Sequence, residues 1–246
     1  MAYMHVLREF AAGVMARLPT VCGLCEDTAQ GGQLCQYCHQ AVTHSMQGRA
    51  LRCPKCRLLL EGRRECPDCK AYEPAFDGVI AAFDYAAPGD LLIHRLKVQR
   101  QFISAGMLAG LLADAVSVSG QALPAKQVLV PVPASRAALQ RRGFNPAAEV
   151  AYGLAKRLQW PCRTDLLVRV REGQKQSYLG RAARISSAQS LYACAKSVQG
   201  LHIAVVDDVM TTGSTLHSVA QVLKAAGAAS VWGMVLARTP SRPVVF

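Results

Sequence analysis

The sequence has no apolar run long enough to cross a membrane and no clear secretion signal. No stretch approaches the ~18 uninterrupted apolar residues that a membrane-spanning helix needs. At the N-terminus, Arg8 and Glu9 interrupt the stretch that would have to form the apolar part of a signal peptide. We therefore expect a cytoplasmic protein without a membrane span.

The sequence also lacks two common nucleotide-binding motifs, and it is short of aromatic and acidic residues. It contains neither G-x-x-x-x-G-K-[ST] nor G-x-G-x-x-G, so a triphosphate P-loop and a dinucleotide site both fit poorly. Aromatic residues make up only 6% of the chain, which leaves few side chains for stacking on nucleic-acid bases. Asp and Glu number 16 against 28 Lys and Arg, which gives a net charge of +12.

Most of this positive charge lies after residue 75. Residues 76–246 hold 19 basic and 9 acidic side chains, and eleven of the basic ones fall between Arg136 and Arg184. Such an excess predicts a polyanionic partner such as phosphate, pyrophosphate or nucleic acid. A solvated surface that keeps the protein soluble is the alternative. With 246 residues, of which 51% are hydrophobic, we expect one large or two unequal globular domains.

Eight of the ten cysteines form four C-x-x-C pairs within one short segment. Nine residues separate the two pairs of each quartet, and the second quartet repeats the first 31 positions later. Two such pairs can place four thiolates around one metal ion, so we expect two structural zinc sites with no open coordination position. The expected zinc ligands are Cys22, Cys25, Cys35, Cys38, Cys53, Cys56, Cys66 and Cys69.

The cysteines also allow other groupings and other chemistry. We predict sequential grouping, in which the first four cysteines share one ion and the last four another, and interleaved grouping is the alternative. Four thiolates also suit an iron–sulfur cluster. Disulfides are disfavoured in a cytoplasmic protein, and a thioredoxin-type site needs one pair beside a βαβ unit.

The chain is predicted to divide into three segments. Residues 1–20 favour an amphipathic helix, because apolar residues recur every three or four positions from Tyr3 to Leu18. Residues 21–75 contain few large apolar side chains and predict a small double zinc-ribbon domain that its metal ions stabilise. Residues 76–246 predict the main domain.

In residues 76–246, apolar strand-like runs alternate with helical stretches, which predicts an α/β fold with a mainly parallel sheet. In such sheets, ligands bind at the carboxyl ends of the strands. The expected strands are Val79–Tyr85, Gln127–Val132, Leu201–Val206 and Ser230–Leu236. One or two helices are expected in Pro88–Val118, and one helix each in Asn145–Leu158 and Thr215–Ala226.

The most informative stretch is I-A-V-V-D-D-V-M-T-T-G-S-T-L, residues 203–216. An apolar strand leads there to Asp207 and Asp208, and a turn of small residues precedes the next helix. Backbone N–H groups and hydroxyls of this turn form a site of phosphate size, and the carboxylates could accept hydrogen bonds from ribose hydroxyls or attract a metal ion. The turn consists of Thr211, Thr212, Gly213, Ser214 and Thr215.

This stretch resembles the ribose-5-phosphate recognition loop of type I phosphoribosyltransferases. The resemblance implies that the ligand is phosphoribosyl pyrophosphate (PRPP), bound with Mg²⁺. It also implies that Asp207 and Asp208 hold the ribose 2′ and 3′ hydroxyls, and that residues 211–215 hold the 5-phosphate. No residue of the sequence identifies the acceptor of a phosphoribosyl transfer.

Three further segments point to one particular family with this kind of domain. V-P-V-P at 130–133, R-R-G-F-N at 141–145 and L-I-H-R-L-K at 92–97, with the cysteines, resemble the ComF family of competence-associated proteins. Members of that family join a cysteine-rich zinc domain to a phosphoribosyltransferase-like domain. The resemblance implies that the segment after V-P-V-P binds pyrophosphate, which makes Arg136, Arg141 and Arg142 the candidate ligands.

The ComF resemblance implies a role in natural transformation, with incoming single-stranded DNA and competence or recombination proteins as partners. Two hypotheses follow from it. The protein is a PRPP-binding phosphoribosyltransferase with an unidentified acceptor, or a non-enzymatic single-stranded DNA-binding protein with a vestigial or sensory PRPP site. Their salt dependence separates them, because DNA binding weakens steeply as salt rises.

One segment departs from the family pattern. Family members carry Asn three residues after an Arg of the loop that covers the site, whereas Ser187 follows Arg184 at that distance here. The loop itself, Arg171–Ser187, is expected to be mobile. The departure affects only a role assigned to the Asn, because the expected PRPP site depends on other residues.

Overall fold

The computed structural model describes residues 18–48, 50–98, 103–170 and 191–240. The expected N-terminal helix lies almost wholly outside the described residues, and so does the loop Arg171–Ser187. Among the residues that are described, every helix is too short or too polar to cross a bilayer.

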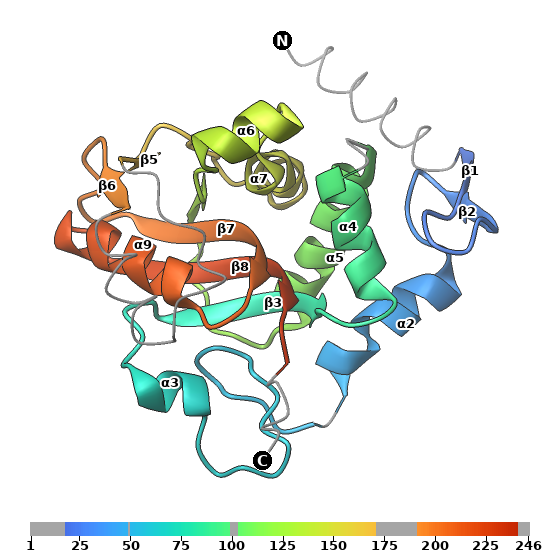
Figure 1. The fold of residues 1–246 in the computed structure, drawn as a ribbon, viewed down its shortest axis with the longest axis horizontal. Helices are drawn as coiled ribbons and strands as arrows, with labels where there is room; N and C mark the ends of the chain where they lie inside the picture. Colours follow the sequence, from blue (N-terminus) through green and yellow to red (C-terminus); the bar gives the residue numbers. More distant parts are fainter. Residues whose placement is uncertain (1–17, 49, 99–102, 171–190, 241–246) are drawn as a thin grey trace.

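A four-stranded parallel sheet forms the centre of the molecule (Figure 1). Its order is β3-β8-β7-β4, and all three neighbouring pairs are parallel. Most residues of these strands are buried, as expected for a parallel sheet with both faces covered. The predicted parallel α/β fold is therefore confirmed. The strands are β3 (Gly78–Asp84), β4 (Val128–Pro131), β7 (His202–Met210) and β8 (Ser230–Arg238).

Strand β7 extends further than the sequence indicated. The apolar run suggested an end at Val206, but the strand continues to Met210 and contains both Asp207 and Asp208. Parallel pairing with β8 explains the difference, since Asp207 lies opposite Val235 and Met210 lies opposite the last residue of β8. The two carboxylates are therefore held by sheet hydrogen bonding and not by a loose turn.

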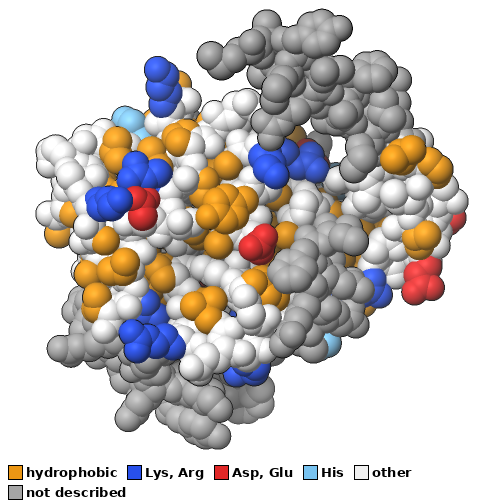
Figure 2. Space-filling model, turned by 90° about the horizontal axis from the view of Figure 1, so that it is seen from above, with side chains coloured by type: hydrophobic (Ala, Val, Ile, Leu, Met, Phe, Trp, Pro, Cys, Tyr) orange, Lys and Arg blue, Asp and Glu red, His pale blue; other side chains and the backbone are white. Residues whose placement is uncertain are grey.

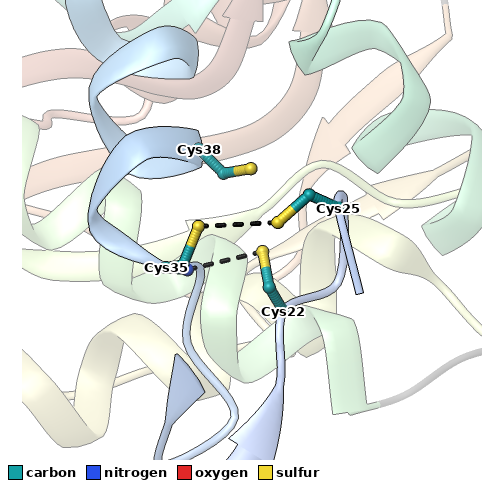
Figure 3. A group of neighbouring side chains, drawn as sticks. All are labelled: Cys22, Cys25, Cys35 and Cys38. Carbon is teal, nitrogen blue, oxygen red and sulfur yellow. Dashed lines mark hydrogen bonds between the residues drawn. The ribbon is translucent and has the colours of Figure 1, made fainter. Parts of the chain in front are cut away.

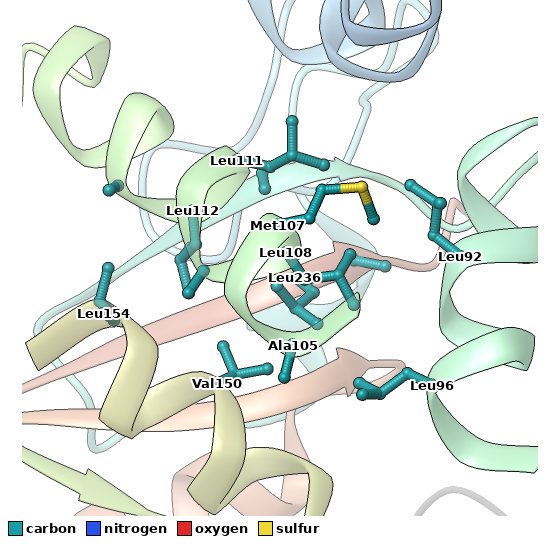
Figure 4. Packing of buried hydrophobic residues seen from close by; sticks show 14 of the residues in the cluster. Leu92, Leu96, Ala105, Met107, Leu108, Leu111, Leu112, Val150, Leu154 and Leu236 are labelled. Atoms are coloured by element: carbon teal, nitrogen blue, oxygen red, sulfur yellow. The ribbon is translucent and has the colours of Figure 1, made fainter. Parts of the chain in front are cut away.

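Helices cover one face of the sheet. These are α4 (Gly89–Val98), α5 (Ile103–Val118) and α7 (Pro146–Leu158), whose apolar side chains pack against alternate residues of the strands (Figure 4). Helix α7 begins as predicted, because the side chain of Asn145 accepts a hydrogen bond from the N–H of Ala147 (3.2 Å) and proline occupies the first helical position. The stretch 88–118 forms two helices.

The opposite face of the sheet is covered by α9 (Ser214–Ala225) and by a two-stranded hairpin of β5 (Leu167–Arg169) and β6 (Tyr192–Cys194). A further helix, α6 (Arg136–Arg142), follows β4 at the carboxyl end of that strand. Gly143 ends this helix with φ 82°, a left-handed conformation that favours glycine.

The cysteine segment forms two small modules. The first cysteine module (residues 19–47) contains the hairpin β1 (Pro19–Val21) and β2 (Thr28–Gln30) followed by α2 (Gln36–Gln47). The second cysteine module (residues 50–72) contains a short bridge between Arg52 and Leu59 followed by α3 (Pro67–Ala71). In both modules the second cysteine pair lies at the start of the helix.

The two cysteine modules pack on opposite faces of the sheet. Cys22, Leu34 and Val42 of the first module join the apolar cluster formed by α5 and α7. Cys56 and Leu58 of the second module join the cluster formed with α9. Each module therefore contributes to a core that it shares with the sheet.

Candidate phosphate site and metal centres

The cysteines of each module lie close enough to share one ion. The four sulfur atoms of either group all lie within 4.8 Å of one another. Figure 3 shows the first group, in which the four side chains point toward one another. The Sγ–Sγ distance is 3.6 Å for Cys25 and Cys35, and 3.5 Å for Cys56 and Cys66. A zinc ion about 2.3 Å from each sulfur would separate tetrahedral ligands by about 3.8 Å. The predicted sequential grouping is confirmed, and the donor sets fit structural zinc.

The closeness of these thiols opposes their joint ionisation. The sulfur atoms of Cys53 and Cys56 raise the pKa of the Cys69 thiol well above its usual range. Four neighbouring thiols cannot all become thiolates unless positive charge compensates them, and metal binding supplies that charge. The second group is the more deeply buried one, since Cys53, Cys56 and Cys66 are buried whereas Cys25 of the first group is exposed.

The candidate phosphate site is the phosphate loop, which we define as residues 211–215, from the residue after β7 to the second residue of α9. Gly213 is the N-cap of α9 and has φ 83°. A Cβ atom there would lie 2.6 Å from Cε of Met210 and 2.9 Å from the Tyr72 hydroxyl, so only glycine fits. The N–H of Ser214 donates to Oγ1 of Thr212 (3.4 Å). The loop thus presents a helix N-terminus and several hydroxyls, which together suit a phosphate group.

The acidic pair precedes this loop by two residues of β7, and Asp207 lies beside the loop. Both Asp207 and residues of the phosphate loop, among them Gly213 and Ser214, line the same small hollow. The backbone N–H of Asp208 donates to Oδ1 of Asp207 (2.8 Å). The structure therefore brings together the acidic pair and the hydroxyl-rich turn that the sequence motif predicted.

A lysine that the sequence analysis did not single out also reaches the acidic pair. Nζ of Lys97, in the last turn of α4, lies 2.9 Å from Oδ1 of Asp208. Both side chains are largely shielded, with 26% and 16% of their surface exposed. The motif L-I-H-R-L-K at 92–97 contained this residue, but only the tertiary fold places the end of α4 beside β7.

Burial makes Asp207 an unusual carboxyl group. Removal from water, and then the charge of Asp208, raise the pKa of Asp207 to about 7. Positive charge placed beside such a carboxyl group would favour its ionised form. Oxygen donors of this kind are the ligands that Mg²⁺ prefers, so the pair fits a magnesium ion bound together with an anionic ligand.

The three arginines predicted to bind pyrophosphate lie in the segment that follows β4, the strand next to β7. All three belong to α6, where Arg136 and Arg141 are exposed and Arg142 is half-buried. Strand β4, which precedes α6, pairs in parallel with β7, so α6 begins at the same edge of the sheet as the acidic pair. Figure 2 shows a face of the molecule seen from above, on which Lys and Arg side chains outnumber Asp and Glu side chains.

The raised pKa of Asp207 predicts how stability depends on pH. The folded chain retains a proton on Asp207 up to about pH 7, whereas the unfolded chain releases it near pH 4. Stability should therefore fall as pH rises through this window, by about 1.4 kcal/mol per unit at most. Asp207→Asn should flatten this decline and raise stability at pH 8, as measured by urea unfolding at pH 5 to 8. An equally steep decline in the variant would contradict the assignment.

Comparison with known proteins gives two kinds of match. Residues 137–245 match the family model described as phosphoribosyl transferase domain. DNA utilization protein YhgH of Salmonella typhi is 33% identical over 92% of this chain and 100% of its own length. Competence protein F of Haemophilus influenzae is 31% identical over 71% of this chain and 79% of its own length.

Two further matches are more distant. Competence protein ComFC of Bacillus subtilis is 29% identical over 76% of this chain and 78% of its own length. A solved structure of Trypanosoma cruzi hypoxanthine phosphoribosyl transferase aligns with 61% of this chain and 66% of that chain, at a TM-score of 0.35 and 19% identity.

Proposed function

Because the chain belongs to the ComF family, with DNA utilization protein YhgH and competence protein F, we propose that it binds PRPP with Mg²⁺ at the carboxyl edge of its sheet. The observation that carries the proposal is the placement of Asp207 and Asp208 at the end of β7, directly before the phosphate loop. Ribose 5-phosphate carries vicinal hydroxyls and a phosphate, and this strand–loop–helix segment carries a pair of carboxylates and a helix N-terminus.

Each part of the ligand meets a group of matching chemistry. The 5-phosphate accepts hydrogen bonds from N–H groups at the start of α9, where the helix dipole also favours negative charge. The ribose hydroxyls donate to Asp207 and Asp208. Asp207 and Asp208 would hold a bound Mg²⁺, which would offset the negative charge of the pyrophosphate. Lys97, which pairs with Asp208 in the free chain, then becomes available to an anionic group of the ligand.

The basic helix α6 is proposed to bind the pyrophosphate. Planar guanidinium groups of Arg136, Arg141 and Arg142 suit phosphate oxygens, and the helix follows V-P-V-P at the same sheet edge. In a transfer reaction these side chains would stabilise the charge that develops as pyrophosphate leaves the ribose C1 atom. The acceptor that would attack this carbon is a matter for substrate screening.

A second function is favoured by the charge of the chain and by the names of its relatives. The net charge of +12 suits a polyanion, and the relatives are named for DNA utilization and competence. We propose that the protein handles single-stranded DNA in natural transformation, and that PRPP binding accompanies this role. The two ligands are compatible, because the phosphate loop occupies only one edge of the sheet.

Calorimetric titration of the whole, zinc-loaded chain with PRPP tests the first proposal. We expect saturable binding in the presence of Mg²⁺ and much weaker binding in EDTA-free buffer without added Mg²⁺. Titration with single-stranded oligonucleotide over 50 to 300 mM salt tests the second, since log affinity should fall linearly with log salt for DNA and only weakly for PRPP. A chain that binds oligonucleotide but no PRPP would overturn the first proposal and retain the second.

A further inference from the structure

The second cysteine module lies directly against the phosphate loop, and two side chains join them. We infer that Arg238 and Tyr72 are positioning residues, which hold the carbonyl groups of the phosphate loop against this module so that its N–H groups face the ligand. The inference rests on the proposed phosphoribosyl site and identifies what maintains its geometry.

Arg238, the last residue of β8, is a buried cation with partners on both sides. Only 1% of its surface is exposed. Its Nε donates to the carbonyl oxygen of Cys56 (3.0 Å), and its Nη2 donates to the carboxylate of Asp68 (2.6 Å). Its Nη1 donates to the carbonyl oxygens of Met210 (3.3 Å) and Thr211. One guanidinium thus connects the second cysteine module to the beginning of the phosphate loop.

Tyr72 makes a second connection of the same kind. Its hydroxyl donates to the carbonyl oxygen of Thr212 (2.6 Å) and lies against Gly213. Its ring packs edge-on against the ring of His217 in α9, with centroids 4.9 Å apart. Nδ1 of His217 accepts from the backbone N–H of Ala75 (3.1 Å), and burial lowers the pKa of this imidazole, so it is held in its neutral form.

These contacts set the direction of the N–H groups in the loop. Three consecutive carbonyl groups, those of Met210, Thr211 and Thr212, accept hydrogen bonds from Arg238 or Tyr72. In a trans peptide the N–H points opposite to the C=O. The N–H groups of residues 211, 212 and 213 therefore point away from the second cysteine module, towards the side where an anion would bind.

The metal group of the second cysteine module takes part in this arrangement. Cys56 contributes its sulfur to the metal group and its carbonyl oxygen to Arg238. Asp68, the carboxylate partner of Arg238, lies in α3 between two of the other cysteines. Whatever displaces these cysteines also displaces the partners of Arg238, which couples metal binding in this module to the shape of the phosphate loop.

Binding measurements on Tyr72→Phe and Arg238→Lys test the inference. Tyr72→Phe removes one hydrogen bond of the loop, and we expect the affinity for ribose 5-phosphate to fall about 5- to 10-fold. Arg238→Lys removes the guanidinium group that donates to both the second cysteine module and the phosphate loop. We expect the affinity for ribose 5-phosphate to fall about 30-fold or more. The affinity for pyrophosphate alone should change less than about twofold, because its proposed site is on α6.

The chain offers a matched control for each variant. Arg52 is also a buried arginine of the second cysteine module (8% exposed), but its guanidinium donates to Asp84 and to the carbonyl oxygens of Ser45 and Arg57, whereas Arg238 donates to carbonyl oxygens of residues 210 and 211. Arg52→Lys should therefore lower the melting temperature without a selective loss of ribose 5-phosphate binding. Tyr37, which is 82% exposed, serves as the control for the loss of a tyrosine hydroxyl.

Hydrogen exchange provides a readout that does not depend on any ligand. In Tyr72→Phe and Arg238→Lys, amides of residues 211–214 should exchange faster, whereas in Arg52→Lys they should exchange at the wild-type rate. Unchanged ribose 5-phosphate affinity together with wild-type exchange in the loop would overturn the inference. A wild-type chain that binds no phosphoribosyl ligand would contradict the proposed function instead, and loop exchange would then decide the inference alone.

Discussion

Replacing both Asp207 and Asp208 by Asn should lower the affinity for PRPP by about 100-fold or more. Each carboxylate is expected to accept a charge-assisted hydrogen bond from a ribose hydroxyl, and each such bond contributes about 1.5–3 kcal/mol. Asn keeps the shape of the side chain, and both positions are fixed by the pairing of β7 with β8. The loss should therefore come from the site and not from unfolding.

Calorimetric titration of the double variant with PRPP and Mg²⁺ measures this effect. Asp165→Asn is a suitable control, because Asp165 pairs with Arg163 and Lys196 outside the strand–loop–helix segment. Two effects on the melting temperature of the double variant oppose each other, since Asp207→Asn removes a buried carboxyl group whereas Asp208→Asn removes the carboxylate that pairs with Lys97, so the melting temperature is measured alongside the affinity. Equal PRPP affinity in wild type and double variant would remove the acidic pair from the proposed site.

Cys56→Ser should destabilise the entire chain, and not only the N-terminal segment. Cys56 is 1% exposed, and its module shares an apolar core with α9 and the sheet. Disrupting the metal group would expose Leu58 and Leu60, each of which contributes about 1.5–3 kcal/mol by burial, and would remove partners of Arg238. With about 2–4 °C per kcal/mol for a chain of this size, the melting temperature should fall by more than about 10 °C.

Calorimetry and metal analysis of Cys56→Ser, compared with Cys25→Ser, measure this effect. Each variant should lose about one of two zinc ions per chain, since each removes a ligand from one four-cysteine group. Cys25 is exposed, so its variant should melt closer to the wild type. Iron in place of zinc in the wild-type chain would favour the iron–sulfur alternative. Two retained zinc ions and an unchanged melting temperature in Cys56→Ser would contradict the metal assignment.

The loss of metal in the second cysteine module also has a functional consequence. The module supports the phosphate loop through Arg238 and Tyr72, whereas the first cysteine module packs on the opposite face of the sheet. The cysteine spacing of the two modules is repeated in the sequence, yet their surroundings in the fold differ. The repeat alone therefore does not indicate which metal group affects the ligand site.

The sequence by itself determined the features that depend on short-range pattern. Alternating apolar runs indicated a parallel sheet, and the start of α7 followed from Asn145 and Pro146. The spacing of the cysteines indicated two four-cysteine groups, because ligands three and ten positions apart can meet around one ion. The phosphate loop was recognisable because one strand, one turn and one helix start build it from consecutive residues.

The tertiary structure alone decided which distant residues meet at the site. Lys97 reaches Asp208 across 111 positions of the sequence. Arg238 reaches Cys56 across 182 positions and Tyr72 reaches Thr212 across 140. Lys97, Arg238 and Tyr72 do not stand out in the sequence, since a lysine in a last helical turn or an arginine at a strand end is ordinary. Their roles arise because the parallel sheet gathers the ends of β7 and β8 at one edge, and because burial there requires every charge and carbonyl group to find a partner.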